Sequence, residues 1–375
     1  MLKNIVANGG CSMPWLHTEI NLQTNQVKPC CKYNDSIGSA QETFLAVWNN
    51  AKYNALRNSM SGGTLPTACS ACNVSPGTFS YKEFKNSAYR FMLSTVPVTP
   101  SVFHFTLKNT CNLACRMCHP TVSSRLAAVS EQSPYLKKFY NAKTVDNKFD
   151  LNKLKGSFKE AQILTIGGGE PLIDEDCIAL IDMVATESSK LRQINFSTNM
   201  TKINQRLIDL LNTLSAKVNF NVSIDGPKHI HNYIRYGCDW NQIVSNLKFL
   251  RKNYRFNYGI NSTVSVLNVG YLGEMLADIS TLEQSTGIKF THLMTSPVLE
   301  NHLHAGILNN EAKALYSIKL NSIQCSNKDH TELIQTGLGL LQEDKHTHWP
   351  EFLEFTKAFD TMTKTDFKTV YPEFN

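Results

Sequence analysis

Three cysteines lie within eight residues of one short segment, NTCNLACRMCHP, which spans residues 109–120. Their spacing, C-x3-C-x2-C, allows Cys111, Cys115 and Cys118 to serve one metal centre. An odd number of cysteines does not make a disulfide framework, and a tetrahedral zinc site needs a fourth ligand, from His119 or a distant cysteine. A [4Fe–4S] cluster held by only three thiolates keeps one iron open. That open iron can bind a chelating small molecule.

A glycine run with an adjacent carboxylate occurs in ILTIGGGEPL, residues 163–172. Glycines at the end of a strand permit positive φ angles and let the backbone approach a ligand closely. The Glu170 carboxylate and nearby backbone carbonyls can together accept hydrogen bonds from an ammonium group. A plain strand-to-helix turn has a similar sequence, and it is the alternative for this segment.

Two later segments place hydrogen-bonding groups at the ends of predicted strands. NFSTN, residues 195–199, offers hydroxyl and amide groups that suit a ribose. VSIDGPKHIHNYIRYG, residues 222–237, includes an arginine whose planar fork suits a carboxylate. Asp-Gly is also a common turn pair, so Asp225 has a structural alternative. The candidate residues of the two segments are Ser197, Thr198, Asn199, Ser223, Asp225 and Arg235.

A second group of cysteines lies in the first part of the chain, in the segments CSMPWLH, VKPCCKY and CSAC. Four thiolates from these segments can close one metal site, and the expected ligands are Cys11, Cys30, Cys69 and Cys72, with Cys31 as the alternative to Cys30. Tetrahedral zinc and a fully ligated [4Fe–4S] cluster both accept four thiolates. The spacing alone therefore does not separate zinc from iron–sulfur.

The regular part of the chain, which must position these residues, begins near residue 101. Apolar and alternating segments predict six strands, and amphipathic stretches between them predict crossover helices. The expected strands are 102–107, 161–166, 191–197, 217–224, 256–266 and 288–294, and the expected helices are 174–188, 202–215, 240–252 and 270–285. This alternation predicts a parallel α/β sheet, either open or curved into a partial barrel. Ligand sites in such sheets lie at the carboxyl ends of the strands, where the motifs occur.

The flanking parts of the chain have weaker patterns. One amphipathic helix is expected from Gln41 to Arg57, and the two prolines in 94–101 indicate a linker. Residues 301–375 have helical spacing and no motif that indicates chemistry. The histidines of this last part are expected to be exposed polar residues: His302, His304, His346 and His348.

Length and composition fit a globular protein of more than one domain, with 375 residues, 42% apolar and 18% charged. No apolar run approaches the length of a membrane span, and no signal peptide is expected before Cys11. Eleven cysteines favour a reducing compartment, so we expect a cytoplasmic protein. The net charge of +6 is not concentrated in a basic run and gives no indication of nucleic-acid binding. The expected division is a cysteine-rich domain (1–95), a core (101–300) and a helical extension (301–375).

The cysteine loop and the motifs after the strands together resemble the radical S-adenosylmethionine (radical SAM) superfamily over residues 101–300. The resemblance implies a partial (β/α)6 barrel whose Cys111, Cys115 and Cys118 hold a [4Fe–4S] cluster with S-adenosylmethionine on its open iron. One electron from the reduced cluster then cleaves S-adenosylmethionine, and the 5′-deoxyadenosyl radical abstracts hydrogen. The implied contacts are Met117 near the adenine, Gly168, Gly169 and Glu170 at the amino group, and Ser197, Thr198, Asn199, Ser223, Asp225 and Arg235 at the ribose or carboxylate.

The N-terminal pattern of C-x-x-PW, V-x-PCC, WNN and C-x-x-C resembles the SPASM/twitch modules, which carry an auxiliary iron–sulfur cluster. Such modules usually follow the radical SAM core, whereas here the pattern precedes it. Its cysteines are fewer than in the full SPASM signature, so the resemblance implies one auxiliary [4Fe–4S] cluster and two clusters in all. A cluster with four protein thiolates does not chelate S-adenosylmethionine and would relay an electron.

The resemblance implies an oxidoreductase or modifying enzyme, and oxidation or cross-linking of a peptide is the first expectation. A small-molecule substrate, such as a sugar, alcohol, amino acid or nucleoside, is the alternative. A non-catalytic, zinc-stabilised binding module is the second alternative, which predicts zinc and no cleavage of S-adenosylmethionine. The expected electron donor is a flavodoxin- or ferredoxin-type protein. A mildly basic face suits such an acidic donor, but the positive charge is better explained as an ordinary solvated surface.

Overall fold

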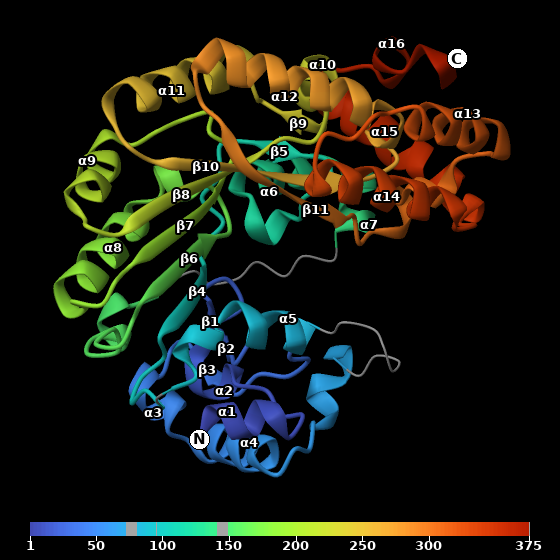
Figure 1. Ribbon diagram of the computed structural model, residues 1–375. Helices are drawn as coiled ribbons and strands as arrows, with labels where there is room; N and C mark the ends of the chain where they lie inside the picture. Colours follow the sequence, from blue (N-terminus) through green and yellow to red (C-terminus); the bar gives the residue numbers. More distant parts are fainter. Residues whose placement is uncertain (73–80, 95, 141–148, 375) are drawn as a thin grey trace.

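The computed structural model describes residues 1–72, 81–94, 96–140 and 149–374 (Figure 1). Within these ranges its centre is a nine-stranded sheet with the order β11-β10-β8-β7-β6-β4-β1-β2-β3, accompanied by the small sheet β5-β9. The strands are β1 (His17–Asn21), β2 (Gln26–Lys28), β3 (Gly38–Ser39), β4 (Val102–Thr106), β5 (Ala114–Cys115), β6 (Ile163–Gly167), β7 (Gln193–Thr198), β8 (Lys217–Ser223), β9 (Arg235–Tyr236), β10 (Asn257–Val264) and β11 (Phe290–Pro297).

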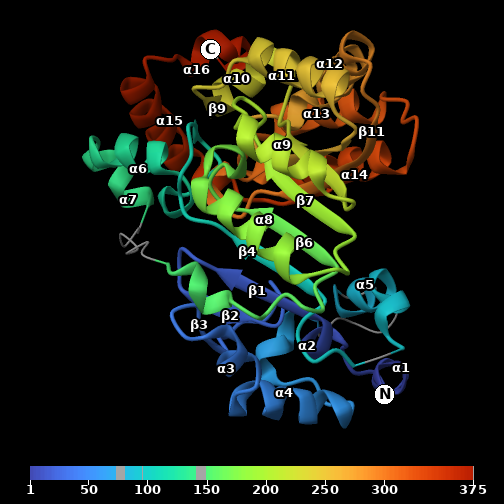
Figure 2. The ribbon, with the colours of Figure 1, turned by 90° about the vertical axis from the view of Figure 1, so that its left-hand side faces the viewer.

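The six predicted core strands are confirmed as β4, β6, β7, β8, β10 and β11, and each pairs in parallel with its neighbour. Helices follow the strands and lie along one face of the curved sheet (Figures 1 and 2). These helices are α8 (Glu175–Glu187), α9 (Gln205–Thr213), α10 (Lys228–Ile234), α11 (Trp240–Asn253) and α12 (Leu272–Thr286). In the described part of the chain β11 remains an edge strand, so the core is an open, partial barrel.

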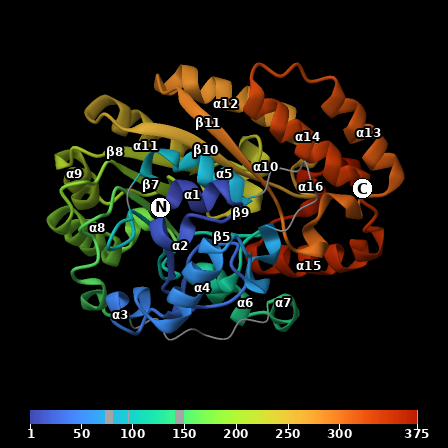
Figure 3. The same ribbon diagram turned by 60° about the horizontal axis from the view of Figure 1, so that its bottom comes forward.

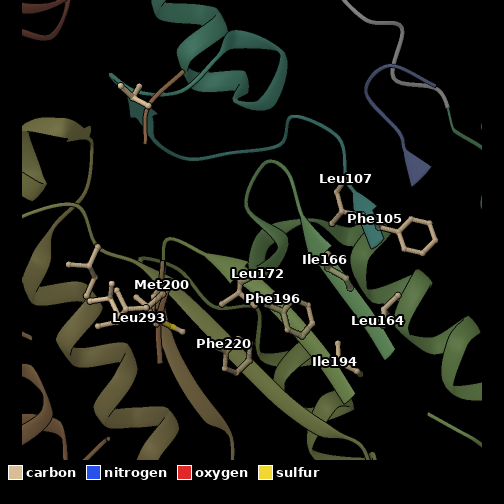
Figure 4. Close-up of a cluster of buried hydrophobic side chains, with 14 of the residues drawn as sticks. Phe105, Leu107, Leu164, Ile166, Leu172, Ile194, Phe196, Met200, Phe220 and Leu293 are labelled. Atoms are coloured by element: carbon tan, nitrogen blue, oxygen red, sulfur yellow. The ribbon is translucent and has the colours of Figure 1, made fainter. Parts of the chain in front are cut away.

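The two faces of the sheet differ in chemistry, because successive side chains of a strand point to opposite sides. The face toward the helices is apolar and includes Leu164, Phe196 and Phe220, which Figure 4 shows among the buried side chains. The opposite face, called here the inner face, carries a row of half-buried polar residues in direct register. This row is His104, Thr165, Asn195, Asn219 and Asn257, on five neighbouring strands.

The N-terminal part joins the same sheet through β1, which pairs in parallel with β4. Its helices are α1 (Leu2–Ala7), α2 (Met13–Leu16), α3 (Phe44–Trp48), α4 (Ala51–Ser61) and α5 (Tyr81–Ala88), and Figures 1 and 2 show them grouped beside β1. The prediction of one helix from Gln41 to Arg57 is wrong, because the chain breaks between α3 and α4. Asn50 causes this break, since its side chain caps α4 by accepting a 2.8 Å hydrogen bond from the Tyr53 N–H.

The last part of the chain is helical, as predicted, and lies on the side of the sheet away from α8 and α9 (Figures 1 and 3). It comprises α13 (Asn310–Asn321), α14 (Lys328–Gln342), α15 (Trp349–Thr363) and α16 (Phe367–Val370). Helix α15 packs on α7 (Pro134–Phe139), which follows α6 (Ser124–Glu131) in the chain, and α14 packs on β11. The expectation of exposed histidines is wrong for two of them: His302 packs between Phe139 and Phe355, and His304 is also buried. None of the helices in the described ranges has the length and apolar character that a membrane crossing requires.

Candidate functional site

The cysteine loop leaves the carboxyl end of β4, and three sets of contacts fix it. Cys111 donates its backbone N–H to Ser124 Oγ over 3.2 Å, at the start of α6. Cys115 lies in β5, whose pairing with β9 places it opposite Arg235. Cys118 closes a turn, because its N–H donates to the Cys115 carbonyl over 3.1 Å. The loop is therefore bound to α6 on one side and to the segment after β8 on the other.

Burial and the neighbouring thiols both raise the pKa values of cysteines in the loop. Burial raises the pKa of Cys115 well above its ordinary value, and the thiols of Cys118 and Cys111 raise this pKa further. Burial also raises the pKa of Cys118 to about 11. Metal ligation requires thiolates, so a bound iron–sulfur cluster would supply the positive charge that these buried thiols need to ionise. The donor set therefore fits a cluster with three protein ligands.

Arg235 brings a positive charge to this loop. Its Nη1 donates to Cys115 Sγ over 3.8 Å, and its Nε donates to Asp225 Oδ2 over 2.7 Å. Asp225 is buried, and its Oδ1 accepts a 2.9 Å hydrogen bond from the Thr263 N–H. Asp225 thus holds the guanidinium in place, which is a more specific role than the turn that Asp-Gly alone suggests.

The glycine run after β6 packs directly against the start of the cysteine loop. Gly168 and Gly169 have φ angles of +79° and +55°, and a Cβ on Gly169 would lie 2.5 Å from the Thr110 carbonyl oxygen. Glu170 donates its N–H to that same Thr110 carbonyl over 2.7 Å. Glycine is required here because the backbone is left-handed and the two segments touch.

The Glu170 carboxylate is buried and accepts three hydrogen bonds from the protein. Oε1 accepts from Thr198 Oγ1 over 2.7 Å and from the Leu172 N–H over 3.1 Å. Oε2 accepts from the Asn199 N–H over 2.6 Å. Asn199 in turn donates from Nδ2 to Asn112 Oδ1 over 3.1 Å, beside Cys111. Glu170 therefore joins the ends of β6 and β7 to the cysteine loop, and one lone pair on Oε2 is left for a ligand ammonium.

Protonation of Glu170 is expected to make the folded protein more stable at acidic pH. Burial raises its pKa from 4.5 to about 7, so the folded state binds more protons than the unfolded chain between these pH values. The contribution is fully present below pH 4.5 and is lost as pH rises through about 7, a change of roughly 3 kcal/mol in the free energy of unfolding. Urea unfolding without S-adenosylmethionine, at about pH 5 and about pH 8, measures this change in the wild type and in Glu170→Gln. An equal pH dependence in both proteins would contradict it.

The other predicted contacts lie nearby but make fewer hydrogen bonds. Ser197 and Ser223 are half-buried on the inner face, and Ser197 Oγ accepts from Asn261 Nδ2 over 3.4 Å. Met117 is half-buried and packs against the core. The structure therefore brings Glu170, Thr198 and Asn199 to the cysteine loop in one hydrogen-bonded group, and Asp225 and Arg235 in another.

The N-terminal cysteines surround one cavity. Cys11, Cys30, Cys69 and Cys72 all line it, together with Met13, Lys32, Tyr33 and Leu65. Burial raises the pKa of Cys30 to about 12, and the thiols of Cys11, Cys31 and Cys69 raise this pKa further. Cys31 is exposed and does not line the cavity. The four cysteines proposed from the sequence thus share one pocket, and their donor set fits a four-thiolate centre.

In the described ranges no group of three or more His, Cys, Asp or Glu side chains is arranged to hold a metal ion. At both sites the fit to a metal centre therefore rests on the identity and proximity of the cysteine donors. The loop offers three thiols, and the N-terminal cavity offers four.

Two family models match the chain. The model described as the radical SAM superfamily matches residues 106–284, and the SPASM model, described as an iron–sulfur cluster-binding domain, matches residues 11–73. The chain contains a radical SAM domain. This radical SAM protein carries its SPASM domain ahead of the radical SAM domain, as the cysteine pattern predicted. The two domain matches indicate S-adenosylmethionine and iron–sulfur clusters as cofactors.

Several solved structures are similar to this chain at low identity. anSMEcpe with bound AdoMet is 19% identical with a TM-score of 0.39, and the match covers 53% of this chain and 52% of that one. SuiB of Streptococcus suis bound to S-adenosylmethionine is 14% identical with a TM-score of 0.37, over 76% and 62% of the two chains. Coproporphyrinogen III oxidase (HemN) from Escherichia coli is 13% identical with a TM-score of 0.35, over 64% and 51%. This chain thus spans about half the length of the first of these structures. A comparison with curated proteins gives no match.

Several residues at the radical SAM site were not found from the sequence. Asn112 links the cysteine loop to Asn199, and Arg116 connects the same loop to the C-terminal helices. Tyr140 is buried close to Cys118, and within the described ranges its hydroxyl has no hydrogen-bond partner. The only sequence signal for Asn112 and Arg116 is their position between the cysteines. Their hydrogen-bond partners are far away in the sequence and give no local pattern.

Proposed function

We propose that this protein reductively cleaves S-adenosylmethionine and uses the resulting radical to oxidise or cross-link a peptide. Two [4Fe–4S] clusters would serve this reaction, one in the cysteine loop and one in the N-terminal cavity. The division into residues 1–95, 101–300 and 301–375 belongs to the same proposal. The observation that carries it is the four-cysteine cavity in an N-terminal part whose β1 extends the core sheet.

The residues of the core site would divide the work of binding. Cys111, Cys115 and Cys118 would hold the cluster, and Glu170 would accept the ammonium of S-adenosylmethionine. Arg235, fixed by Asp225, would face the cofactor carboxylate with the N–H groups that Asp225 does not use. Met117 would lie near the adenine, and Ser197 and Ser223 on the inner face near the ribose. When bound, the cluster and S-adenosylmethionine supply the electron and the 5′-deoxyadenosyl radical.

The N-terminal cavity would hold its cluster by all four thiolates, from Cys11, Cys30, Cys69 and Cys72. Because such a cluster has no open iron, these residues favour electron transfer over the binding of S-adenosylmethionine. Removal of a hydrogen atom and then an electron and a proton from the substrate makes the net reaction an oxidation. A flavodoxin- or ferredoxin-type donor in the cytoplasm would supply the electron for the core cluster.

The inner face supports a polar substrate, because amide and hydroxyl side chains dominate its row, which Glu19 continues on β1 in register with His104. Asn219 Nδ2 donates to Asn195 Oδ1 over 2.8 Å, and Asn195 Nδ2 donates to Thr165 Oγ1 over 3.3 Å. Burial lowers the pKa of His104 to about 4, so this side chain is neutral near pH 7. Amide and hydroxyl groups match peptide amides best, and they also match the hydroxyls of a sugar or alcohol, which is the second candidate.

Anaerobic reconstitution tests the proposal through iron, sulfide and zinc per chain, followed by a 5′-deoxyadenosine assay with dithionite. We expect about eight irons per chain, corresponding to two [4Fe–4S] clusters, and formation of 5′-deoxyadenosine. About four irons with one zinc would retain the core reaction and make the N-terminal centre structural. Zinc without iron would instead support the non-catalytic binding module.

A further inference from the structure

Arg116 is a buried cation in the middle of the cysteine loop, between Cys115 and Cys118. Its side chain is 1% exposed, and its guanidinium lies 3.8 Å from the centre of the Tyr233 ring and 4.4 Å from that of Phe359. A charge in this environment is costly unless it is paired and hydrogen-bonded. The groups that pair with Arg116 therefore identify the parts of the protein that hold the cysteine loop in place.

These partners come mainly from the C-terminal helices. Arg116 Nη2 donates to Asp360 Oδ1 over 2.5 Å and to Thr365 Oγ1 over 2.7 Å. Asp360 lies near the end of α15 and also accepts from Tyr233 OH over 3.0 Å and from the Phe367 N–H over 2.7 Å. One carboxylate thus joins the cysteine loop, α10, α15 and the start of α16.

The buried Arg116–Asp360 ion pair is not the arrangement that selection for folding stability alone would favour. In the described structure Arg116 Nη1 is buried without a hydrogen-bond partner, which costs free energy. Replacing a buried ion pair by apolar residues of similar volume is often neutral or stabilising. A buried ion pair with an unsatisfied N–H group, located between two proposed cluster ligands, indicates a functional constraint.

The Arg116–Asp360 ion pair holds the loop at the turn that leads from Cys115 to Cys118. Cys115 is paired in the β5–β9 ladder, and the Arg116 N–H donates to the Ile234 carbonyl over 2.8 Å. Beyond this residue the chain turns toward Met117 and Cys118, and the Arg116 side chain anchors that turn to α15.

We propose that Arg116 and Asp360 are positioning residues for cofactor binding, so that the C-terminal helices form part of the S-adenosylmethionine site. They act through Met117 and Cys118, whose placement follows the anchored turn. This inference rests on the proposed cluster in the cysteine loop.

Four variants of the reconstituted full-length protein test the inference: Arg116→Met, Asp360→Asn, their combination, and Glu354→Gln. Glu354 is the matched control, because it also forms an ion pair between α15 and the core, with Lys138 of α7. Unlike Arg116 and Asp360, the Glu354 and Lys138 side chains are both accessible to solvent. Each protein is measured for iron content, thermal unfolding, affinity for S-adenosylmethionine, and the electron paramagnetic resonance spectrum of the reduced cluster with and without S-adenosylmethionine.

We expect Arg116→Met to retain its iron and to bind S-adenosylmethionine about tenfold to a hundredfold more weakly, because small displacements of a positioned group have effects of this size. The combined variant should regain thermal stability relative to Asp360→Asn, because no unpaired charge is left, yet its affinity and spectrum should stay altered. Glu354→Gln should match the wild type in every measurement.

Wild-type affinity and spectrum in Arg116→Met would overturn the proposal. Recovery of both in the combined variant, together with stability, would overturn it too, since the pair would then only stabilise the fold. A wild-type protein whose iron gives no response to S-adenosylmethionine would instead refute the proposed function, which separates the two failures.

Discussion

Cys115→Ala is expected to abolish the reductive cleavage of S-adenosylmethionine. The cysteine loop contains three thiols for a cluster that needs three protein ligands, so this substitution leaves it one ligand short. Cys115 is also the thiol that faces Arg235, and it is held in the β5–β9 pairing. The measurement is 5′-deoxyadenosine formed per chain with dithionite, after anaerobic reconstitution of wild type and variant in parallel.

Cys325→Ala is the matched control for this experiment, because Cys325 is a half-buried cysteine between α13 and α14, outside both cysteine groups. It should retain the iron content and the cleavage rate of the wild type. If Cys115→Ala still forms 5′-deoxyadenosine at a wild-type rate, the assignment of the cluster to this loop is wrong.

The combined variant Cys69→Ala and Cys72→Ala is expected to lose about half of the iron and to keep cleavage of S-adenosylmethionine. Both residues line the N-terminal cavity and lie in one short 3-10 helix, Thr67–Cys72, so the substitution removes two of four ligands from one segment. The core loop is untouched, because none of its ligands comes from this part. Turnover of the substrate should nevertheless stop, since the proposed electron acceptor is missing.

Cys31→Ala is the control that shows whether the loss of iron is specific to the cysteines of the cavity. Its side chain is exposed and lies outside the cavity, so its iron content should equal that of the wild type. An unchanged iron content in the Cys69 and Cys72 variant would show that the cavity holds no iron–sulfur cluster, and zinc analysis of the same samples would then identify the alternative.

The regular part of the fold was predictable because each core strand has its own local pattern. The segment 217–224, for example, alternates toward the two faces of the sheet, and β8 occupies Lys217–Ser223. The cysteine loop and the glycine run could also be placed, since both directly follow strands whose carboxyl ends meet at one edge.

The remaining contacts depend on residues that are far apart in the sequence. The strand β1 has only five residues, and its pairing with β4 leaves no signal in its own composition. Asp360 lies 244 residues after Arg116, and no local pattern connects a helix end to a distant loop. The prediction of a single helix over 41–57 failed because the apolar spacing continues across Asn49 and Asn50, while the capping side chain favours two helices.

The parallel pairing of β1 with β4 has a consequence for the order in which the protein forms during synthesis. His17–Asn21 leaves the ribosome well before its partner Val102–Thr106, so this pairing waits for a long stretch of chain. Until then β1 has only its short antiparallel partner β2. The cysteine-rich part therefore completes its structure together with the core, and its cavity takes its final form only when β4 is in place. Contacts of such long range form slowly, so the thiols of the N-terminal cavity stay accessible until the core sheet assembles.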